Sequence, residues 1–213
     1  MVEFLASGPK CPSARFLCAH GAGAGMATPF LAAIAAALAE RGLATLRFEF
    51  AYMAGRRTGG GKKVAPRADR LIDEYVAAVA AAPTGVPLII GGKSMGGRVA
   101  SLVADRLFAE GQIAGLVCLG YPFHPPHKPA QLRTAHLQHL ACPTLIAQGE
   151  RDPFGNRGEV EGYALSDVIR LIWAADGDHD LGPRGASGHT RRGNLAAAAD
   201  AIAAFASAIA QRG

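Results

Sequence analysis

"IIGGKSMGGRVASLVA", residues 89–104, joins an apolar run, a cluster of glycines around one serine, and a pattern typical of an amphipathic helix. Its centre, Gly92 to Gly96, fits the spacing G-x-S-x-G with Ser94 in the middle. Glycines two residues before and two residues after the serine remove side chains that would collide with a neighbouring strand and helix at a sharp turn. The stretch therefore predicts a strand-to-helix turn that holds the Ser94 hydroxyl above the edge of a sheet.

Two other interpretations of this turn are open. The serine could cap the helix on a glycine-rich packing turn, or the turn could bind a phosphate group. The spacings G-x-G-x-x-G and G-x-x-x-x-G-K-[ST] are both absent from this stretch, which disfavours the phosphate. In a catalytic turn, the helix N-terminus after the serine would offer free N–H groups and a partial positive charge to a developing oxyanion.

Short apolar strands alternate with alanine-rich helices along the chain. We expect strands at residues 2–6, 15–19, 44–50, 87–91, 115–120, 143–149 and 168–173. Apolar periodicity and end signals predict helices at residues 28–42, 66–83 and 94–110 and from residue 194 to about residue 209. This alternation favours an α/β fold with a mostly parallel sheet flanked by helices, in a single domain over residues 1–213. The connection between the fifth and sixth strands is too short for a large cap domain.

A serine hydroxyl is a poor nucleophile at neutral pH unless a base accepts its proton and an acid orients that base. In a sheet of this kind the acid and then the histidine follow the serine along the chain, each after the carboxyl end of a strand. Asp152 follows the strand at 143–149, and His179 follows the strand at 168–173. We therefore expect Ser94, Asp152 and His179 to be the catalytic residues.

Other acids lie close to both partners. Glu150 competes with Asp152, and we favour Asp152 because the proline that follows it holds the residue extended, away from the strand. Asp178 and Asp180 flank the histidine in "DGDHD", where we expect them to make and cap a turn.

A glycine-rich segment, His20 to Met26, follows the strand at 15–19. Glycines allow backbone N–H groups to approach a ligand closely, so we expect the backbone amides of Ala22 and Met95 to form an oxyanion hole. We expect His20 to be structural and to bond the backbone of its own loop.

Composition excludes several classes of protein. The 213 residues carry 22 Lys and Arg, 17 Asp and Glu, and a net charge of +5. Apolar runs are interrupted well before the length of a membrane span, and the N-terminus lacks the pattern of a secretory signal. The four cysteines form no C-x-x-C pair, and we expect reduced, mostly buried thiols. The sequence therefore predicts a cytoplasmic protein that acts on a small molecule and binds neither a membrane nor nucleic acid; it does not indicate an oligomeric state.

A basic stretch runs from Arg56 to Arg70 without interleaved aromatic residues. We interpret it as a solvated loop first, as a binding face for acidic substrates second, and as a nucleic-acid contact only after these. Histidines at 124, 127, 136 and 139 lack a cysteine or carboxylate at zinc-like spacing. We expect no metal and no cofactor.

Five segments together resemble the α/β-hydrolase superfamily over nearly the whole chain: "HGAGAGM", "GGKSMGGR", "CLGYPFHPP", "GERDPFG" and "DGDHDL". They look most like the small bacterial predicted hydrolases related to dienelactone hydrolases, a group whose eukaryotic relatives include a subunit of a chromatin-modifying complex. The resemblance implies an α/β-hydrolase fold, a triad of Ser94, Asp152 and His179, and an oxyanion hole at Ala22 and Met95. True dienelactone hydrolases have a cysteine nucleophile, so a dienelactone substrate is not supported.

The expected function is that of a serine hydrolase, a carboxylic ester hydrolase that acts on a small ester, thioester or similar acyl substrate. Tyr52, Met53, Tyr121 and His124 follow the carboxyl ends of strands, and we expect them to be candidates for the substrate pocket. The rival interpretation is a non-catalytic protein-interaction module on the same fold.

Overall fold

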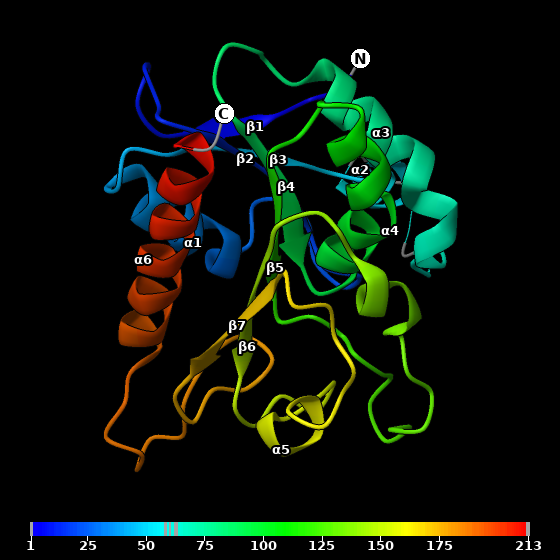
Figure 1. The fold of residues 1–213 in the computed structure, drawn as a ribbon, viewed down its shortest axis with the longest axis vertical. Helices are drawn as coiled ribbons and strands as arrows, with labels where there is room; N and C mark the ends of the chain where they lie inside the picture. Colours follow the sequence, from blue (N-terminus) through cyan, green and yellow to red (C-terminus); the bar gives the residue numbers. More distant parts are fainter. Residues whose placement is uncertain (1, 58, 60, 62–63, 212–213) are drawn as a thin grey trace.

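The computed structural model describes residues 2–57, 59, 61 and 64–211. Its centre is a seven-stranded sheet with the strand order β1-β3-β2-β4-β5-β6-β7, shown in Figure 1. The strands are β1 (Leu5–Ser7), β2 (Arg15–Ala19), β3 (Ala44–Phe48), β4 (Leu88–Lys93), β5 (Gly115–Leu119), β6 (Thr144–Gly149) and β7 (Ile169–Ala174). Strand β1 pairs antiparallel with β3, and the other neighbours are parallel. The carboxyl ends of β2 to β7 therefore lie at one edge.

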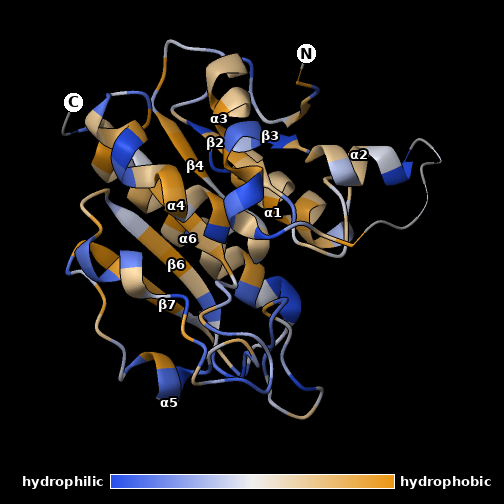
Figure 2. Cartoon of the chain, turned by 90° about the vertical axis from the view of Figure 1, so that its right-hand side faces the viewer, coloured by the Kyte–Doolittle hydropathy of each residue, from blue (hydrophilic) through white to orange (hydrophobic). Residues whose placement is uncertain are grey.

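Helices cover both faces of this sheet. Successive side chains of a strand point to opposite faces of the sheet, so alternate residues of each strand fall into two different apolar clusters. Leu17 and Ile90 belong to the cluster under α3 (Ile72–Ala81) and α4 (Met95–Ala109), whereas Phe16 and Ile89 belong to the cluster under α1 (Pro29–Ala39) and α6 (Arg191–Ala210). Figure 2 shows the apolar strands between these helices. Burial on both faces explains why the strands are continuous apolar runs.

The N-terminal caps follow from short polar side chains. The Thr28 hydroxyl accepts a hydrogen bond from the amide of Leu31 (3.4 Å), and Pro29 begins α1. The Thr190 hydroxyl accepts one from the amide of Gly193 (3.0 Å), so α6 begins at Arg191 rather than at the expected residue 194. These contacts satisfy amides that a helix leaves unpaired in its first turn.

Helix α6 is the one helix in the described part of the chain that is long and apolar enough to cross a membrane. It packs against α1, β6 and β7. The residues that it buries there are Asn194, Leu195, Ala198, Ala199, Ile202 and Ala206. Its apolar surface is therefore used inside the domain.

Two short helices were not expected from the sequence. The strand predicted at 44–50 ends at Phe48, and Ala51–Arg57 forms α2 because a Glu74 carboxylate oxygen accepts a hydrogen bond from the amide of Ala51 (2.6 Å). Helix α5 (Arg157–Val160) begins with a capping box between Asn156 and Glu159. Short 3-10 helices lie at Ala68–Leu71 and Ala135–His139. The first strand is also shifted, since residues 2–4 precede it.

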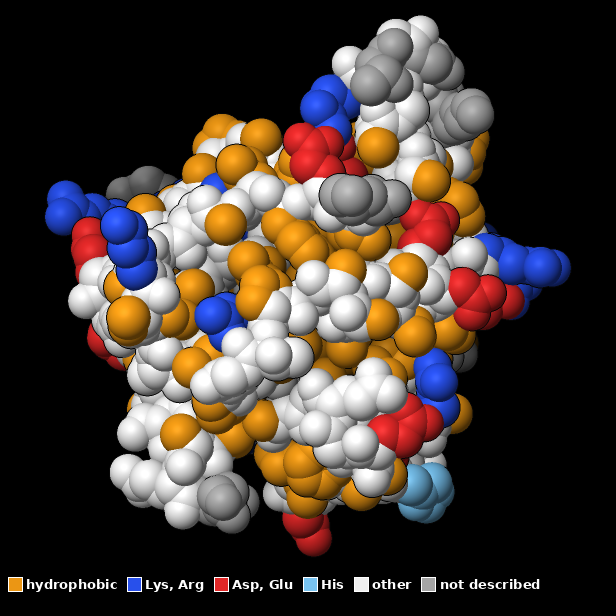
Figure 3. All heavy atoms as spheres, turned by 90° about the horizontal axis from the view of Figure 1, so that it is seen from above, with side chains coloured by type: hydrophobic (Ala, Val, Ile, Leu, Met, Phe, Trp, Pro, Cys, Tyr) orange, Lys and Arg blue, Asp and Glu red, His pale blue; other side chains and the backbone are white. Residues whose placement is uncertain are grey.

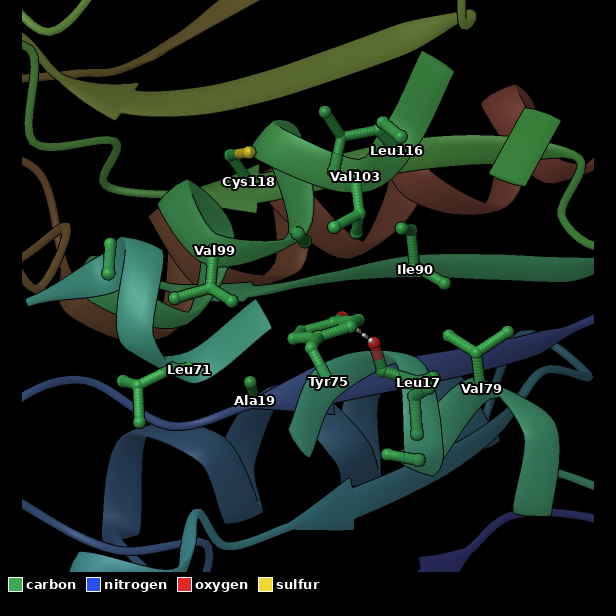
Figure 4. Packing of buried hydrophobic residues seen from close by; sticks show 14 of the residues in the cluster. Leu17, Ala19, Leu71, Tyr75, Val79, Ile90, Val99, Val103, Leu116 and Cys118 are labelled. Atoms are coloured by element: carbon green, nitrogen blue, oxygen red, sulfur yellow. Dashed lines mark hydrogen bonds between the residues drawn. The ribbon is translucent and has the colours of Figure 1, made fainter. Parts of the chain in front are cut away.

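The hydroxyl of Tyr75, on α3, reaches the middle of the sheet. It donates to the carbonyl oxygen of Gly91 (2.7 Å), lies 3.2 Å from that of Leu17, and accepts from the Gly91 amide (2.8 Å). Figure 4 shows the ring between Leu17, Ile90 and Val99. A side chain at Gly91 would collide with the Val117 carbonyl oxygen. Tyr75 therefore connects α3 to β4 just before the turn at Ser94.

The edge where the parallel strands begin lies opposite Ser94. Figure 3 views the molecule from that side and shows hydrophobic side chains gathered near its centre. A cavity of about 520 Å³ lies at this edge, between the end of α3, the starts of β4 and β5, and the end of α6. This cavity is separate from the carboxyl edge of the sheet, where two other cavities lie beside Ser94.

Candidate active site

Ser94 occupies the turn between β4 and α4, with φ 51° and ψ −115°. Residues other than glycine rarely adopt such backbone angles, and this conformation costs about 1–3 kcal/mol. The turn persists because its surroundings are close-packed: a side chain at Gly92 would collide with the Ala19 carbonyl oxygen, and one at Gly96 with the carbonyl oxygens of Ala19 and His20. The G-x-S-x-G spacing is thus a steric requirement of this turn.

Three predicted residues are joined by hydrogen bonds. The Ser94 hydroxyl lies 2.8 Å from Nε2 of His179, and Nδ1 of His179 lies 2.8 Å from a carboxylate oxygen of Asp152. Asp152 is fully buried. Its carboxylate also accepts from Nε2 of Gln148 (3.0 Å) and from the amide of Phe154 (2.8 Å). These two donors hold the carboxylate toward the imidazole.

The competing acid, Glu150, points elsewhere. Its carboxylate accepts from the amide of Asp176 (2.8 Å) and pairs with Arg157 (3.0 Å). The backbone N–H of Asp176, and then the Arg157 guanidinium, lower the pKa of Glu150. The amide of Arg151 donates to the carbonyl of Gly177 (2.8 Å). Glu150 therefore helps to clamp together the loops that carry Asp152 and His179.

The loop around the histidine is organised by its acids. A carboxylate oxygen of Asp178 accepts from the amides of Asp180 (2.9 Å) and Gly182 (2.8 Å), which is the turn-making role expected for it. The phenyl ring of Phe154 lies on the imidazole of His179, with ring centroids 4.2 Å apart. These contacts hold the loop and the imidazole in place.

His20 is buried and bonds the backbone around it, as expected. Its Nε2 accepts from the amide of Phe50 (3.2 Å), and its Nδ1 lies 2.6 Å from the carbonyl oxygen of Gly21. The ring therefore donates from Nδ1, which identifies the neutral tautomer. Burial lowers the pKa of His20, with smaller opposing effects from Gly21 and Glu49.

Ala22 and Met95, the expected oxyanion donors, lie near Ser94. Both line a cavity beside the serine, and Met95 is the first residue of α4. Within the described residues, neither amide nitrogen has a hydrogen-bond acceptor. The Tyr52 hydroxyl donates to the Ala22 carbonyl oxygen (3.1 Å), which holds the loop.

Two cavities meet at Ser94 and share Ala22 and Phe154. The smaller, of about 300 Å³, is lined by Gly21, Ala22, Gly23, Ala24, Thr28, Phe30, Leu31, Lys93, Ser94, Phe154, His179 and Asp180. The larger, of about 780 Å³, is lined by Ala22, Ala65, Pro66, Arg67, Ala68, Asp69, Ser94, Met95, Arg98, Leu102, Pro122, Pro125, Gln131, Leu132, Arg133 and Phe154. The serine can therefore contact the two halves of one substrate on different sides.

The four residues expected in the pocket lie behind these walls. Tyr52 and Met53 are buried under the glycine-rich loop, and Tyr121 donates to the carbonyl oxygen of Arg133 (3.0 Å). Nδ1 of His124 lies 2.8 Å from the carbonyl oxygen of Pro125, and its Nε2 lies 3.5 Å from Glu159. The structure corrects this part of the sequence interpretation: none of the four residues lines either cavity, and the three polar side chains contact backbone carbonyl oxygens of loops instead.

The walls include residues that sequence reasoning did not assign to the pocket. Phe30 and Phe154 are the aromatic members, and Lys93 adds an ammonium group that is almost buried. Lys93 Nζ lies 3.2 Å from Asp180 and 5.5 Å from the centre of the Phe30 ring. Burial lowers the pKa of Lys93, and Asp180 opposes this effect. In the sequence, the only sign that Lys93 could line the pocket was its position directly before Ser94.

The basic stretch is largely paired where the structure describes it. Arg57 contacts Glu3 (2.8 Å) and Glu49 (3.0 Å), and Arg67 contacts Asp69 (3.1 Å). Lys62 and Lys63 lie outside the described residues. Over the described ranges, no three His, Cys, Asp or Glu side chains are grouped so that they could hold a metal ion.

Comparison with known proteins identifies the family. A family model described as an alpha/beta hydrolase domain matches residues 12–207, and the chain therefore belongs to the alpha/beta hydrolases. This match, with the fold of Figure 1, confirms the predicted fold class and the resemblance drawn from the motifs.

Solved structures agree on the fold. An alpha-beta serine hydrolase homologue from Coxiella burnetii has a TM-score of 0.68 and 19% identity over 95% of this chain and 90% of its own. A dienelactone hydrolase from Anabaena variabilis has a TM-score of 0.69 and 21% identity over 94% and 88%. Est1E from Butyrivibrio proteoclasticus, with ferulic acid bound, has a TM-score of 0.67 and 17% identity over 94% of both chains.

Proposed function

We propose that this protein is a serine hydrolase that cleaves a small ester, thioester or similar acyl substrate through Ser94, His179 and Asp152. The observation that carries the proposal is the pair of 2.8 Å contacts that join the three side chains at a strained strand-to-helix turn. A strained backbone conformation persists only where the surrounding structure holds it in place. Here the surrounding residues hold the Ser94 hydroxyl against the imidazole of His179. The family supports a hydrolase.

The chemistry follows from the contacts. Ser94 Oγ attacks the acyl carbon while Nε2 of His179 takes the hydroxyl proton. Asp152 holds the Nδ1–H and stabilises the imidazolium. The amides of Ala22 and Met95 donate to the oxyanion, and His179 then gives its proton to the departing alcohol or thiol. Water, activated by the same imidazole, releases the acid and restores Ser94. Every step is performed by groups of the chain and water.

The solved structures add support from substrates. Est1E holds ferulic acid, an aromatic carboxylic acid, and another structural neighbour is called a dienelactone hydrolase. Ferulic acid is a carboxylic acid, and a lactone is a cyclic ester of a carboxylic acid. We infer that this chain also acts on a carboxylic ester.

The test is covalent labelling combined with turnover. A fluorophosphonate probe should label the native protein at Ser94, and short aryl esters should be hydrolysed. Ser94→Ala should abolish both signals. Ser13→Ala, at an exposed serine outside both cavities, should abolish neither. Labelling that persists in Ser94→Ala, or folded wild-type protein without labelling or turnover, would leave the non-catalytic interaction module as the better interpretation.

A further inference from the structure

Two guanidinium groups lie in the wall of the larger cavity, beside Ser94. Arg98 belongs to the first turn of α4, and Arg133 follows the proline-rich connection after β5. Both are half-buried. In the described chain, neither has a carboxylate within 4.0 Å, and Nε of Arg98 is buried without a hydrogen-bond acceptor. Six other arginines each pair with an acid: Arg41, Arg57, Arg67, Arg151, Arg157 and Arg184.

The two groups are close enough to repel each other. Burial, and then the charge of Arg98, lower the pKa of Arg133, and the same two causes lower the pKa of His136. Among the described residues that line this cavity, Asp69 is the one acid, and it is exposed and held by Arg67. Half-buried charges of one sign are unfavourable unless a counter-charge joins them. A ligand can supply the charge that the chain does not.

We propose that Arg98 and Arg133 form a subsite for a carboxylate carried by the acyl part of the substrate. This inference rests on the proposed hydrolase function and gives its substrate class: monoesters or monothioesters of short dicarboxylic acids. A guanidinium binds a carboxylate through two parallel N–H groups.

The position of Arg98 sets the geometry of such a substrate. The Arg98 amide donates to the Ser94 carbonyl oxygen (3.0 Å), so the two residues are one helical turn apart on the same side of α4. Helical side chains lean toward the N-terminus, and this directs Arg98 toward the serine. A carboxylate bound there lies a few carbon atoms from the acyl carbon under attack.

The second cavity accounts for the other half of the substrate. His179 must protonate the departing oxygen or sulfur, and His179 lines the smaller cavity. The alcohol or thiol therefore occupies the smaller cavity while the charged acyl part occupies the larger one. The balanced reaction consumes one monoester and one water, and it yields the dicarboxylate, the alcohol and a proton.

The test compares two esters of similar length, 4-nitrophenyl hemiglutarate and 4-nitrophenyl valerate, as a ratio of kcat/KM. Wild type should favour the hemiglutarate. Arg98→Gln and Arg133→Gln should each reduce the ratio by about tenfold or more, since a charged hydrogen bond is lost. Arg106→Gln is the matched control: it removes the same charge from an exposed position of α4 outside the cavity, and the ratio should stay at the wild-type value.

Several outcomes would overturn the subsite. A ratio that is unchanged in both cavity variants, or that falls equally in Arg106→Gln, removes the two arginines from recognition. A stronger preference for 4-acetoxybenzoate, whose charge lies in the alcohol part, reverses the orientation. Circular dichroism and Tm confirm that each variant is folded before its ratio is used.

A binding measurement separates this inference from the proposed function. Glutarate should bind Ser94→Ala protein in isothermal titration calorimetry, and Kd should rise about tenfold or more when Arg98→Gln is added. Arginine-dependent binding without any ester turnover would support the subsite and refute the hydrolase. Turnover with an arginine-independent ratio and no glutarate binding would do the opposite.

Discussion

At the scale of single residues, the site depends on which acid reaches the imidazole. Asp152 and Glu150 are two positions apart, yet one is fully buried against His179 and the other bonds the amide of Asp176. The buried carboxylate accepts three hydrogen bonds, from His179, Gln148 and Phe154. Several donors fix the direction in which the carboxylate faces the imidazole, which is what an orienting acid needs.

The two acids should differ sharply when they are neutralised. Asp152→Asn should lower kcat by a factor of roughly hundreds or more, because the amide favours the wrong imidazole tautomer. Glu150→Gln should have a mild effect, since Glu150 helps to hold the loops of Asp152 and His179 together but does not contact the imidazole. Steady-state kinetics on one aryl ester measure both. The reverse ranking would transfer the orienting role to Glu150.

The arrangement of Ser94, His179 and Asp152 could be predicted from the sequence, whereas the lining of the pocket could not. A serine, an acid and a histidine must each follow the carboxyl end of a strand, in a fixed order along the chain. Their order and spacing in the sequence therefore identify the candidate residues. Tyr52 and Tyr121 occupy equivalent slots but point inward, where their hydroxyls bond backbone carbonyls. The direction of a loop side chain depends on packing between distant segments, and no local pattern records it.

At the scale of elements, the loops after β6 and β7 act as one unit. Asp176 accepts from the backbone and side chain of Arg184 and contacts Arg151 (2.8 Å). Arg151 lies in the loop after β6, whereas Asp176 and Arg184 lie in the loop after β7, so these contacts join the two loops. Hydrogen bonds from Arg184, first from its side chain and then from its amide, lower the pKa of Asp176 from 3.8 to about 2.

This pair makes a testable contribution to acid stability. A depressed pKa means that the stabilisation is present above the unfolded value of 3.8 and is lost as the pH falls toward 2. Asp176→Asn should therefore lower Tm at neutral pH and flatten the decline of Tm between pH 4 and pH 2. Differential scanning calorimetry across this range measures both effects.

The matched control is Asp73→Asn, at an exposed acid of α3 without an ion pair among the described residues. It should leave the wild-type decline intact. If Asp176→Asn follows the wild-type curve in parallel, the loops are held by their backbone contacts alone.

The elements missed by sequence reasoning have tertiary causes. Helix α2 depends on Glu74, which lies 23 residues from the Ala51 amide that it caps. Helix α5 carried a readable local signal, since its capping box is Asn156 followed three residues later by Glu159. The long elements were predicted within a few residues because their periodicity and caps are local properties.

At the scale of the whole molecule, the domain presents its serine without a large cap over it. The connection from β5 to β6 contains the 3-10 helix Ala135–His139 and supplies Pro125, Leu132 and Arg133 to the cavity wall. A short connection therefore both omits the cap and builds one side of the site. On such a scaffold the side chains of the cavity walls are the groups available to select a substrate, and Arg98 and Arg133 are the charged ones that lack a carboxylate partner among the described residues.

The phenol that connects α3 to β4 has a spectroscopic consequence. All four tyrosines of the chain have a raised pKa, with burial as the main cause; Tyr52 reaches about 12, and Tyr75 lies well above the ordinary value of 10.0. The unfolded chain loses these protons near pH 10, so the native state loses stability as the pH rises through that value. The ultraviolet absorbance of phenolate should stay below that of the unfolded chain at pH 10, and its main rise should coincide with unfolding at higher pH. Tyr75→Phe should remove one of four chromophores and, because Gly91 loses its partner, bring this rise to lower pH. A gradual native titration centred near pH 10 would show that the phenols are open to water.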